Sequence, residues 1–207
     1  MTAGTNRRKF LKSAALAAAG AALPTRVFAQ IATANTREGA ILATARREVE
    51  RAGSVLWRRD IAGIVDFSLN SNTPRFHFAN LENGTVRSFL VTHGKGSDPE
   101  HTGYLQYFSN LPGSNATSRG AYITWEWYTG RYGTSIRLGG LNPDNSNALE
   151  RAIVMHPAAY ATPEHIAKWG QLGRSDGCFA MDPKDFNEAL WHLSGGRLLF
   201  ADKLGLG

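Results

Sequence analysis

Asn83-Gly84 narrows the choice of fold more than any other dipeptide in the chain, because it separates two runs of strand-forming residues. Residues 75–81 alternate aromatic with polar side chains, and residues 85–92 begin directly after the glycine. Asn-Gly between two such runs is the preferred sequence of a type I′ β-hairpin turn. The sequence therefore predicts an antiparallel strand pair here and a fold built on a sheet.

Other parts of the chain extend this pattern. Short runs with strand character also occupy residues 61–69, 122–128, 135–141, 152–156 and 197–201. Helices are expected after a capping box formed by Asn35 and Glu38, and after Thr162-Pro163 and Asp182-Pro183, which resemble N-caps with a first helical turn. Residues 94–120 form a long loop rich in Gly, Ser, Asn and Pro, and such loops often carry a functional site. The pattern predicts one strand-dominated α+β domain.

The first 29 residues have the basic, apolar and cleavage regions of a secretory signal. Asn6-Arg7-Arg8-Lys9-Phe10-Leu11-Lys12 is similar to the twin-arginine motif. Residues 13–23 are apolar, but too few for the about 20 residues of a membrane span. We expect cleavage after Ala29, which leaves residues 30–207 as one periplasmic domain. That domain would begin with a helical segment over residues 30–58 and have no stable membrane span.

This signal also accounts for the charge of the chain. The sequence has 23 Lys and Arg against 17 Asp and Glu, a net charge of +6. Residues 1–29 hold five of the basic residues and no acidic one, so the remainder has 18 against 17, a net charge of +1. A nucleic-acid partner requires a basic mature surface, and none is therefore expected.

Cys178 is the single cysteine, so no internal disulfide is possible. It ends the segment Gly173-Arg174-Ser175-Asp176-Gly177-Cys178, a turn in which core packing explains a thiol poorly. A reactive thiolate needs a histidine, another positive charge or a helix N-terminus to lower its pKa from about 8.5. His156 closes the apolar run 152–156, a rigid place from which an imidazole can face the thiol. The two residues predict a Cys–His nucleophile pair.

Seven segments in order resemble the murein L,D-transpeptidase catalytic-domain family of the YkuD-like L,D-transpeptidase superfamily. They are Val65-Asp66-Phe67-Ser68, His93-Gly94-Lys95-Gly96-Ser97, Phe108-Ser109-Asn110, Ser118-Arg119-Gly120-Ala121-Tyr122, Arg137-Leu138-Gly139-Gly140-Leu141, Arg151-Ala152-Ile153-Val154-Met155-His156 and the Cys178 segment. The resemblance covers residues 61–204, nearly all of the mature chain.

The resemblance implies a single catalytic domain over residues 30–207, a mixed β-sandwich with a few peripheral helices. It implies Cys178 as the nucleophile and His156 as the base, with the turn of Ser175, Asp176 and Gly177 offering backbone N–H groups to the oxyanion. No cofactor and no metal are implied. The implied substrates are peptidoglycan stem peptides, which the enzyme would join through 3-3 cross-links between diamino-acid residues. Such a thiol is also a carbapenem target.

Two positions depart from the wider superfamily. Asp176 stands where a histidine is usual, and Ala180 stands where an arginine is common. The residue that binds the substrate carboxylate is therefore open, with Lys95, Arg119 and Arg174 as the candidates, and His93 is a further possible substrate-binding residue. His93 either replaces the missing imidazole or anchors its loop through hydrogen bonds.

Alternative functions use the same residues differently. Water as acceptor would give an L,D-carboxypeptidase or endopeptidase. A non-catalytic cell-wall-binding module would use the aromatic run Tyr122, Trp125, Trp127 and Tyr128, and a zinc peptidase would use His93, Asp98 and His101. A papain-like enzyme would place its cysteine before its histidine, which is the reverse of the order here.

Overall fold

The computed structural model describes residues 36–206 of the chain. The proposed signal over residues 1–29 lies outside the described residues, as does Asn35. The helices are α2 (Arg37–Ala52), α3 (Pro163–Trp169) and α4 (Pro183–Leu193). The strands are β1 (Ile61–Asp66), β2 (Phe76–Asn80), β3 (Thr85–Phe89), β4 (Gly120–Gly130), β5 (Gly133–Gly140), β6 (Val154–Pro157), β7 (Phe179–Met181) and β8 (Leu198–Asp202).

Hydrogen bonds link all these strands into one mixed sheet with the order β3-β2-β1-β8-β4-β5-β6-β7. The neighbours β2–β3 and β4–β5 are antiparallel hairpins, whereas β1–β8 and β6–β7 are parallel pairs. The strand that ends the chain therefore lies in the middle of the sheet. The short strand β7 forms one edge.

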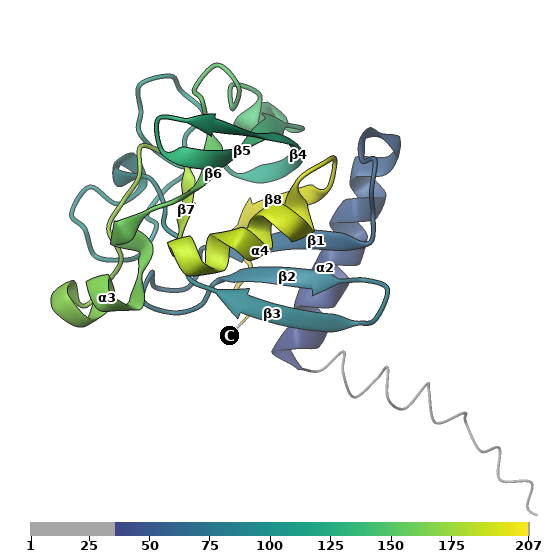
Figure 1. The fold of residues 1–207 in the computed structure, drawn as a ribbon, viewed down its shortest axis with the longest axis horizontal. Helices are drawn as coiled ribbons and strands as arrows, with labels where there is room; N and C mark the ends of the chain where they lie inside the picture. The colour runs from purple at the N-terminus through teal and green to yellow at the C-terminus, as the bar shows by residue number, and fades with distance from the viewer. Residues whose placement is uncertain (1–35, 207) are drawn as a thin grey trace, which may run out of the picture.

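Helices α2 and α4 cover opposite faces of the sheet (Figure 1), and each face has its own apolar cluster. On one face, Ile41, Ala45 and Val49 of α2 are buried against β1, β4 and β8. On the other, Phe186 and Leu193 of α4 join side chains from both halves of the sheet in a single core. The strand-dominated α+β class expected from the sequence is confirmed.

Three local details differ from the sequence predictions. The cap of α2 is Thr36, whose hydroxyl accepts from the Gly39 N–H at 3.1 Å, and not a box with Asn35. The β2–β3 connection is a four-residue loop over residues 81–84. Only Gly84 in it has positive φ (+69°), whereas a type I′ turn needs two such residues. β7 was not predicted, because three residues are too few to show a period.

The other helix starts agree with the sequence. Thr162 caps α3 by accepting from the His165 N–H, and Asp182 caps α4 by accepting from the Lys184 N–H. Within residues 36–206, no helix has both the length and the apolar composition that crossing a membrane requires.

Candidate active site

The parallel pair β6–β7 carries the predicted base His156 on β6, and the predicted nucleophile Cys178 directly precedes β7. Met155 pairs with Phe179 and His156 with Ala180, and the side chains of Met155 and Phe179 are in the core. Successive side chains of a strand alternate between its two faces. His156 and Ala180 therefore share the face of the pair opposite Met155 and Phe179, and Cys178 lies directly before β7.

The thiol of Cys178 is buried, with 6% of the residue exposed. Its Sγ donates to the carbonyl of Ala152 at 3.6 Å. Burial raises the pKa of the thiol. The Val154 backbone N–H and the Arg151 guanidinium lower this pKa, while the carboxylate of Asp176 raises it further. The resting side chain is thus a protonated thiol with a carbonyl acceptor.

The turn before Cys178 is closed by a serine. The Ser175 hydroxyl donates to the Cys178 carbonyl at 2.6 Å and accepts from the Gly177 N–H at 3.2 Å. Gly177 has φ +116°, and a Cβ there would lie 2.7 Å from the Ala116 carbonyl oxygen. Glycine is therefore required before the cysteine. Because its N–H is already donated, Gly177 is not free to bind an oxyanion as the sequence suggested.

Residues 93–97 support this turn through their backbone. The Ser175 N–H donates to the His93 carbonyl, and the Lys95 N–H donates to the Ser175 carbonyl at 2.8 Å. A Cβ on Gly94 would lie 2.8 Å from both the Cα and the N of Gly177. The glycine of this segment thus allows two backbones to touch next to the nucleophile.

The imidazole of His156 is buried and held in place from two directions. Its Nδ1 lies 3.0 Å from the Pro157 carbonyl, and its ring stacks on Tyr132 with centroids 4.4 Å apart. Burial lowers the pKa of His156, partly offset by the Pro157 carbonyl. No hydrogen bond between this imidazole and Cys178 is present in the described residues.

His93 is an anchor of its loop. The Arg75 guanidinium donates to its Nδ1 at 2.8 Å, so Nε2 carries the proton and donates to Asp98 at 3.3 Å. The residue is 1% exposed, and burial, with the Arg75 charge, lowers its pKa to about 3. The substrate-binding role considered for His93 is therefore not supported, because both ring nitrogens are occupied in the interior.

The other candidate substrate-binding residues differ in where their side chains lie. Lys95 forms an exposed ion pair of 2.7 Å with Asp176, beside the nucleophile turn. Arg174 instead donates to the backbone carbonyls of Asp98 and Pro99. The carboxylate of Asp176 therefore pairs with Lys95 and not with Arg174.

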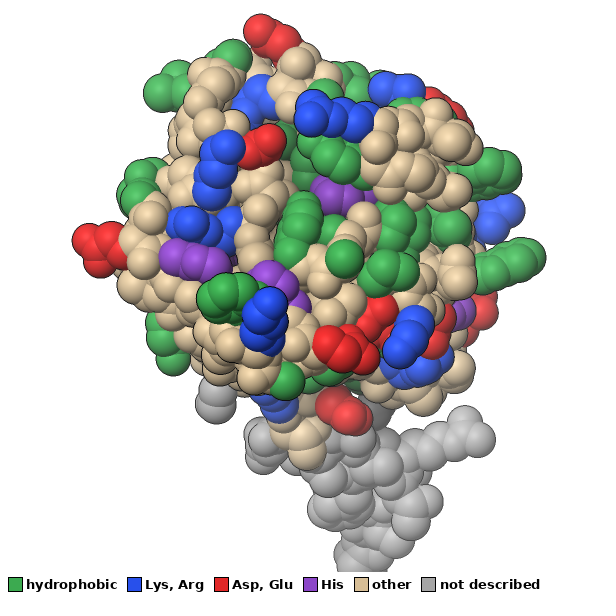
Figure 2. All heavy atoms as spheres, turned by 60° about the vertical axis from the view of Figure 1, so that its left-hand side comes forward, with side chains coloured by type: hydrophobic (Ala, Val, Ile, Leu, Met, Phe, Trp, Pro, Cys, Tyr) green, Lys and Arg blue, Asp and Glu red, His purple; other side chains and the backbone are tan. Residues whose placement is uncertain are grey.

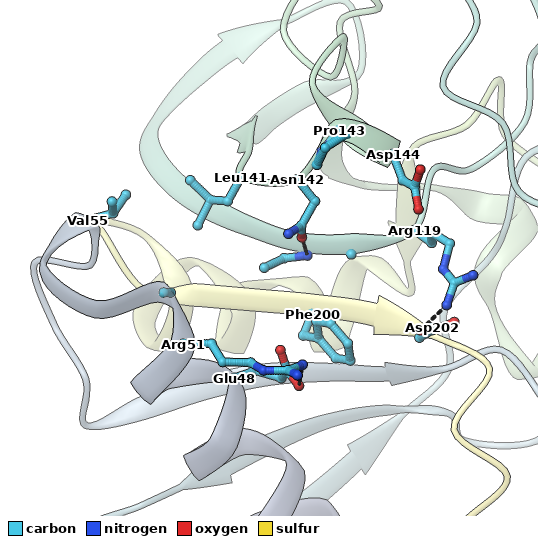
Figure 3. A pocket seen from close by; sticks show the side chains of 13 residues that line it. Glu48, Arg51, Val55, Arg119, Leu141, Asn142, Pro143, Asp144, Phe200 and Asp202 are labelled. Atoms are coloured by element: carbon cyan, nitrogen blue, oxygen red, sulfur yellow. Dashed lines mark hydrogen bonds and ion pairs between the residues drawn. The ribbon is translucent and has the colours of Figure 1, made fainter.

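Arg119 belongs to another surface. It pairs with Asp202 at 2.7 Å and lines a hollow of about 710 Å³ between α2 and the end of β8, together with Glu48 and Phe200 (Figure 3). Cys178 and His156 do not line this hollow. Arg119 is therefore not brought to the nucleophile.

Three residues that act on the thiol of Cys178 or on the imidazole of His156 were missed as site residues by the sequence analysis. Arg151 donates to the Ser109 carbonyl at 2.8 Å and to the Ala116 carbonyl, and its positive charge acts on Cys178. Burial raises the pKa of Tyr160 to about 12, and the charges of Cys178 and Asp176 add to the effect. Tyr132 lies in the β4–β5 hairpin, where the sequence indicated only a turn. Arg151 begins the family-like segment 151–156, directly before the predicted strand that carries His156, and this position could have marked it as a site residue.

Histidine, basic and hydrophobic side chains gather next to one another on the face that Figure 2 shows. Among the described residues, no three His, Cys, Asp or Glu side chains converge as a metal site requires. In particular, the Nε2 of His101 lies 3.0 Å from the Leu172 carbonyl, so His101 does not join His93 and Asp98.

Comparison with solved structures gives distant similarities. An L,D-transpeptidase from Mycobacterium smegmatis is 15% identical, with 69% of this chain and 58% of that one covered and a TM-score of 0.42. The L,D-transpeptidase LdtMt1, solved with imipenem, is 15% identical over 69% of this chain and 59% of its own (TM-score 0.41). The cell shape determining protein Pgp2 from Campylobacter jejuni is 11% identical over 77% and 55% (TM-score 0.43). This chain thus spans 55% to 59% of their length.

Comparison of sequences is more specific. No curated protein sequence matches the chain. The profile of the L,D-transpeptidase catalytic domain, of the YkuD type, matches residues 36–201. This match extends over nearly all the described residues and confirms the resemblance seen in the seven segments. The chain belongs to the L,D-transpeptidase catalytic domain family.

Proposed function

We propose that this chain is a cysteine L,D-transpeptidase that acts on peptidoglycan stem peptides through an acyl-thioester at Cys178. The observation that carries the proposal is that His156 lies on β6 while Cys178 directly precedes β7, the strand paired with β6 in parallel. The nucleophile turn is fixed there by the backbone of residues 93–97. Family membership supports the same chemistry.

The proposed reaction has two acyl transfers. Cys178 Sγ attacks the carbonyl carbon of the third stem residue, a diamino acid, and the bond to the terminal D-Ala breaks, so that D-Ala leaves with a proton on its amine. The thioester is then attacked by the side-chain amine of a second stem. A new amide forms, the thiol is released, and the two third residues are joined by a 3-3 cross-link.

His156 is the base of this proposal. Its Nδ1 faces the Pro157 carbonyl, which fixes the proton on Nδ1 and leaves Nε2 as the nitrogen that accepts one. The thiol must leave the Ala152 carbonyl and turn toward Nε2 when a substrate binds. Catalytic hydrogen bonds are often long or absent without substrate.

The oxyanion needs backbone donors at the same turn. Since the Gly177 N–H is donated to Ser175, we assign this role to the N–H groups of Asp176 and Cys178. Arg151 supplies the positive charge near the sulfur that the missing second imidazole would supply elsewhere in the superfamily.

The acylation test uses a carbapenem and the intact mass of the protein. The wild-type chain should gain the mass of one carbapenem, and Cys178→Ala should gain none while keeping its fold. Removal of the sulfur leaves a small, apolar side chain, so the fold should persist. An equal adduct on folded Cys178→Ala would refute the nucleophile, and no adduct on the wild type would favour a wall-binding module.

The reaction products show whether an amine or water attacks the thioester. Sacculi incubated with the enzyme should yield 3-3 cross-linked muropeptides after digestion. Shortened stems without cross-links would instead make the chain a carboxypeptidase or endopeptidase.

We also propose export to the periplasm by the twin-arginine route, supported by the Arg7-Arg8 pair and by the extracytoplasmic position of peptidoglycan. Replacement of both arginines by lysine should leave the protein in the cytoplasm. Unchanged export, or a mature protein that still begins at Met1, would contradict it.

A further inference from the structure

A second hollow lies away from the thiol, between the β4–β5 hairpin and the C-terminal half of α4. It has a volume of about 480 Å³. We call it the tryptophan groove, and its lining residues are Arg58, Trp127, Thr134, Leu190, Trp191 and Ser194. None of the six carries a negative charge.

The two indoles of the groove are exposed to an unusual degree. Trp127 is 60% exposed and Trp191 is 83% exposed. A third indole, Trp57, is 69% exposed and packs over Gly196, whose carbonyl accepts from its backbone N–H at 2.9 Å. Exposed apolar side chains that cluster around a hollow mark binding sites, whereas single ones need no explanation.

The chemistry of the groove favours a sugar chain over a protein partner. A pyranose ring has an apolar C–H face, which stacks on an indole, and a rim of hydroxyl groups. The groove has matching parts: the two indoles for the apolar face, and the hydrogen-bonding groups of Thr134, Ser194 and Arg58 for the hydroxyl rim.

Charge identifies the sugar chain more closely. Arg58 is shared with an adjoining hollow that Arg59, Arg197, Asp60 and Glu82 also line. Asp60 pairs with Arg197 at 2.7 Å, whereas Arg58 and Arg59 have no ion-pair partner among residues 36–206. A glycan that bears acidic peptides complements this pair, because its sugars meet the indoles while its carboxylates meet the arginines. A neutral glycan would leave both arginines unused.

We propose that the tryptophan groove binds a glycan strand of the polymer whose stem peptides are processed at Cys178. This inference rests on the proposed function. The same hairpin joins the two places, since it carries Trp127 and Thr134 at the groove and Tyr132 on the imidazole of His156. A strand held in the groove would thus deliver its stems to a site in the same part of the molecule.

The binding experiment uses the mature, full-length protein and a soluble β-1,4-linked N-acetylglucosamine tetramer, followed by calorimetry. Trp127→Ala and Trp191→Ala should each weaken binding about tenfold, the loss expected for one stacked aromatic ring. Trp169→Ala is the matched control, because Trp169 lies in α3 outside the groove and is also 60% exposed. It should bind as the wild type does.

A second arm uses intact sacculi and the Cys178→Ala protein. Arg58→Gln with Arg59→Gln should weaken binding to sacculi several-fold, and added salt should weaken the wild type similarly. Absence of binding to the tetramer, or equal weakening by Trp169→Ala, would overturn the proposal. A dimer in sedimentation that Trp191→Ala dissociates, without any sugar binding, would overturn it as well.

Failure of this inference is separable from failure of the proposed function. Carbapenem acylation of Cys178 requires no glycan, so the groove variants should acylate at the wild-type rate. If they do and no sugar binds, only the groove assignment is lost.

Discussion

Gly94→Ala tests whether the backbone of residues 93–97 holds the turn before Cys178 in place. Gly94 has φ −73° and ψ 144°, which any residue adopts, so alanine adds no backbone strain here. The added Cβ would lie 2.8 Å from the Cα and N of Gly177, and closer still to the Asn115 carbonyl. All three are backbone atoms, which cannot turn aside as a side chain does. The variant therefore introduces backbone clashes on two sides, with Gly177 and with Asn115.

The size of the effect follows from these contacts. Ordinary van der Waals contact begins at 3.4 Å, so the backbones of Gly94 and Gly177 must separate by 3.4 − 2.8 = 0.6 Å, and the Asn115 carbonyl must move away by more than that. Overpacking of this kind costs about 1–3 kcal/mol of unfolding free energy. The same shift moves Cys178 relative to His156, and a misplacement of about 1 Å costs about 10²-fold in rate. We expect acylation to slow by about 10- to 100-fold.

The assay measures the rate of carbapenem acylation together with unfolding in urea. Gly113→Ala is the control, since Gly113 is in the same long loop, has φ +76° and has open space around its Cβ position. It should lose about 1–2 kcal/mol through strain alone and keep its acylation rate. If Gly94→Ala keeps both stability and rate, or if Gly113→Ala slows acylation equally, the reasoning is refuted.

Three further predictions concern titrating groups. His156→Ala should slow acylation by about 10² to 10⁴, the usual loss for a general base, and an unchanged rate would remove His156 from the mechanism. Asp176→Asn should move the pH profile of Cys178 alkylation to lower pH, because the carboxylate raises the pKa of the thiol; a shift to higher pH would contradict this. The folded pKa of His93 is about 3 against 6.5 unfolded, so its stabilising contribution is complete above pH 6.5 and is lost as the pH falls toward 3. The unfolding free energy should drop by about 1–2 kcal/mol between pH 7 and pH 5, and urea titrations that coincide at the two pH values would disprove it.

Much of the fold was predictable because its signals are local. Alternation found most strands, and the caps Thr162 and Asp182 fixed two helix starts. The Asn83-Gly84 turn was predicted as the wrong type, since Asn80 accepts from two backbone N–H groups of the loop and stabilises a longer connection. The sequence pattern alone does not show that the Asn80 side chain favours this longer loop over a two-residue turn.

The candidate site was predictable only in its chemistry. Cys178 and His156 were singled out by residue type and context, whereas the partners of His93 are separated from it in sequence. Arg75 lies in the turn before β2, and nothing local indicates that it reaches an imidazole 18 positions later. Tyr132 lies at the tip of the β4–β5 hairpin, and no local sequence signal indicates that its ring stacks on His156.

The middle position of β8 has a consequence for biosynthesis. β8 is the sole strand that joins β1 to β4 within the described sheet, so the halves on either side of it have no strand pairing with each other until it is in place. A nascent chain therefore cannot complete the sheet before the residues of β8, Leu198–Asp202, leave the ribosome. Such long-range pairing makes folding late and concerted. Loss of the few residues after position 197 would cost the whole architecture, although they are far from the thiol in sequence.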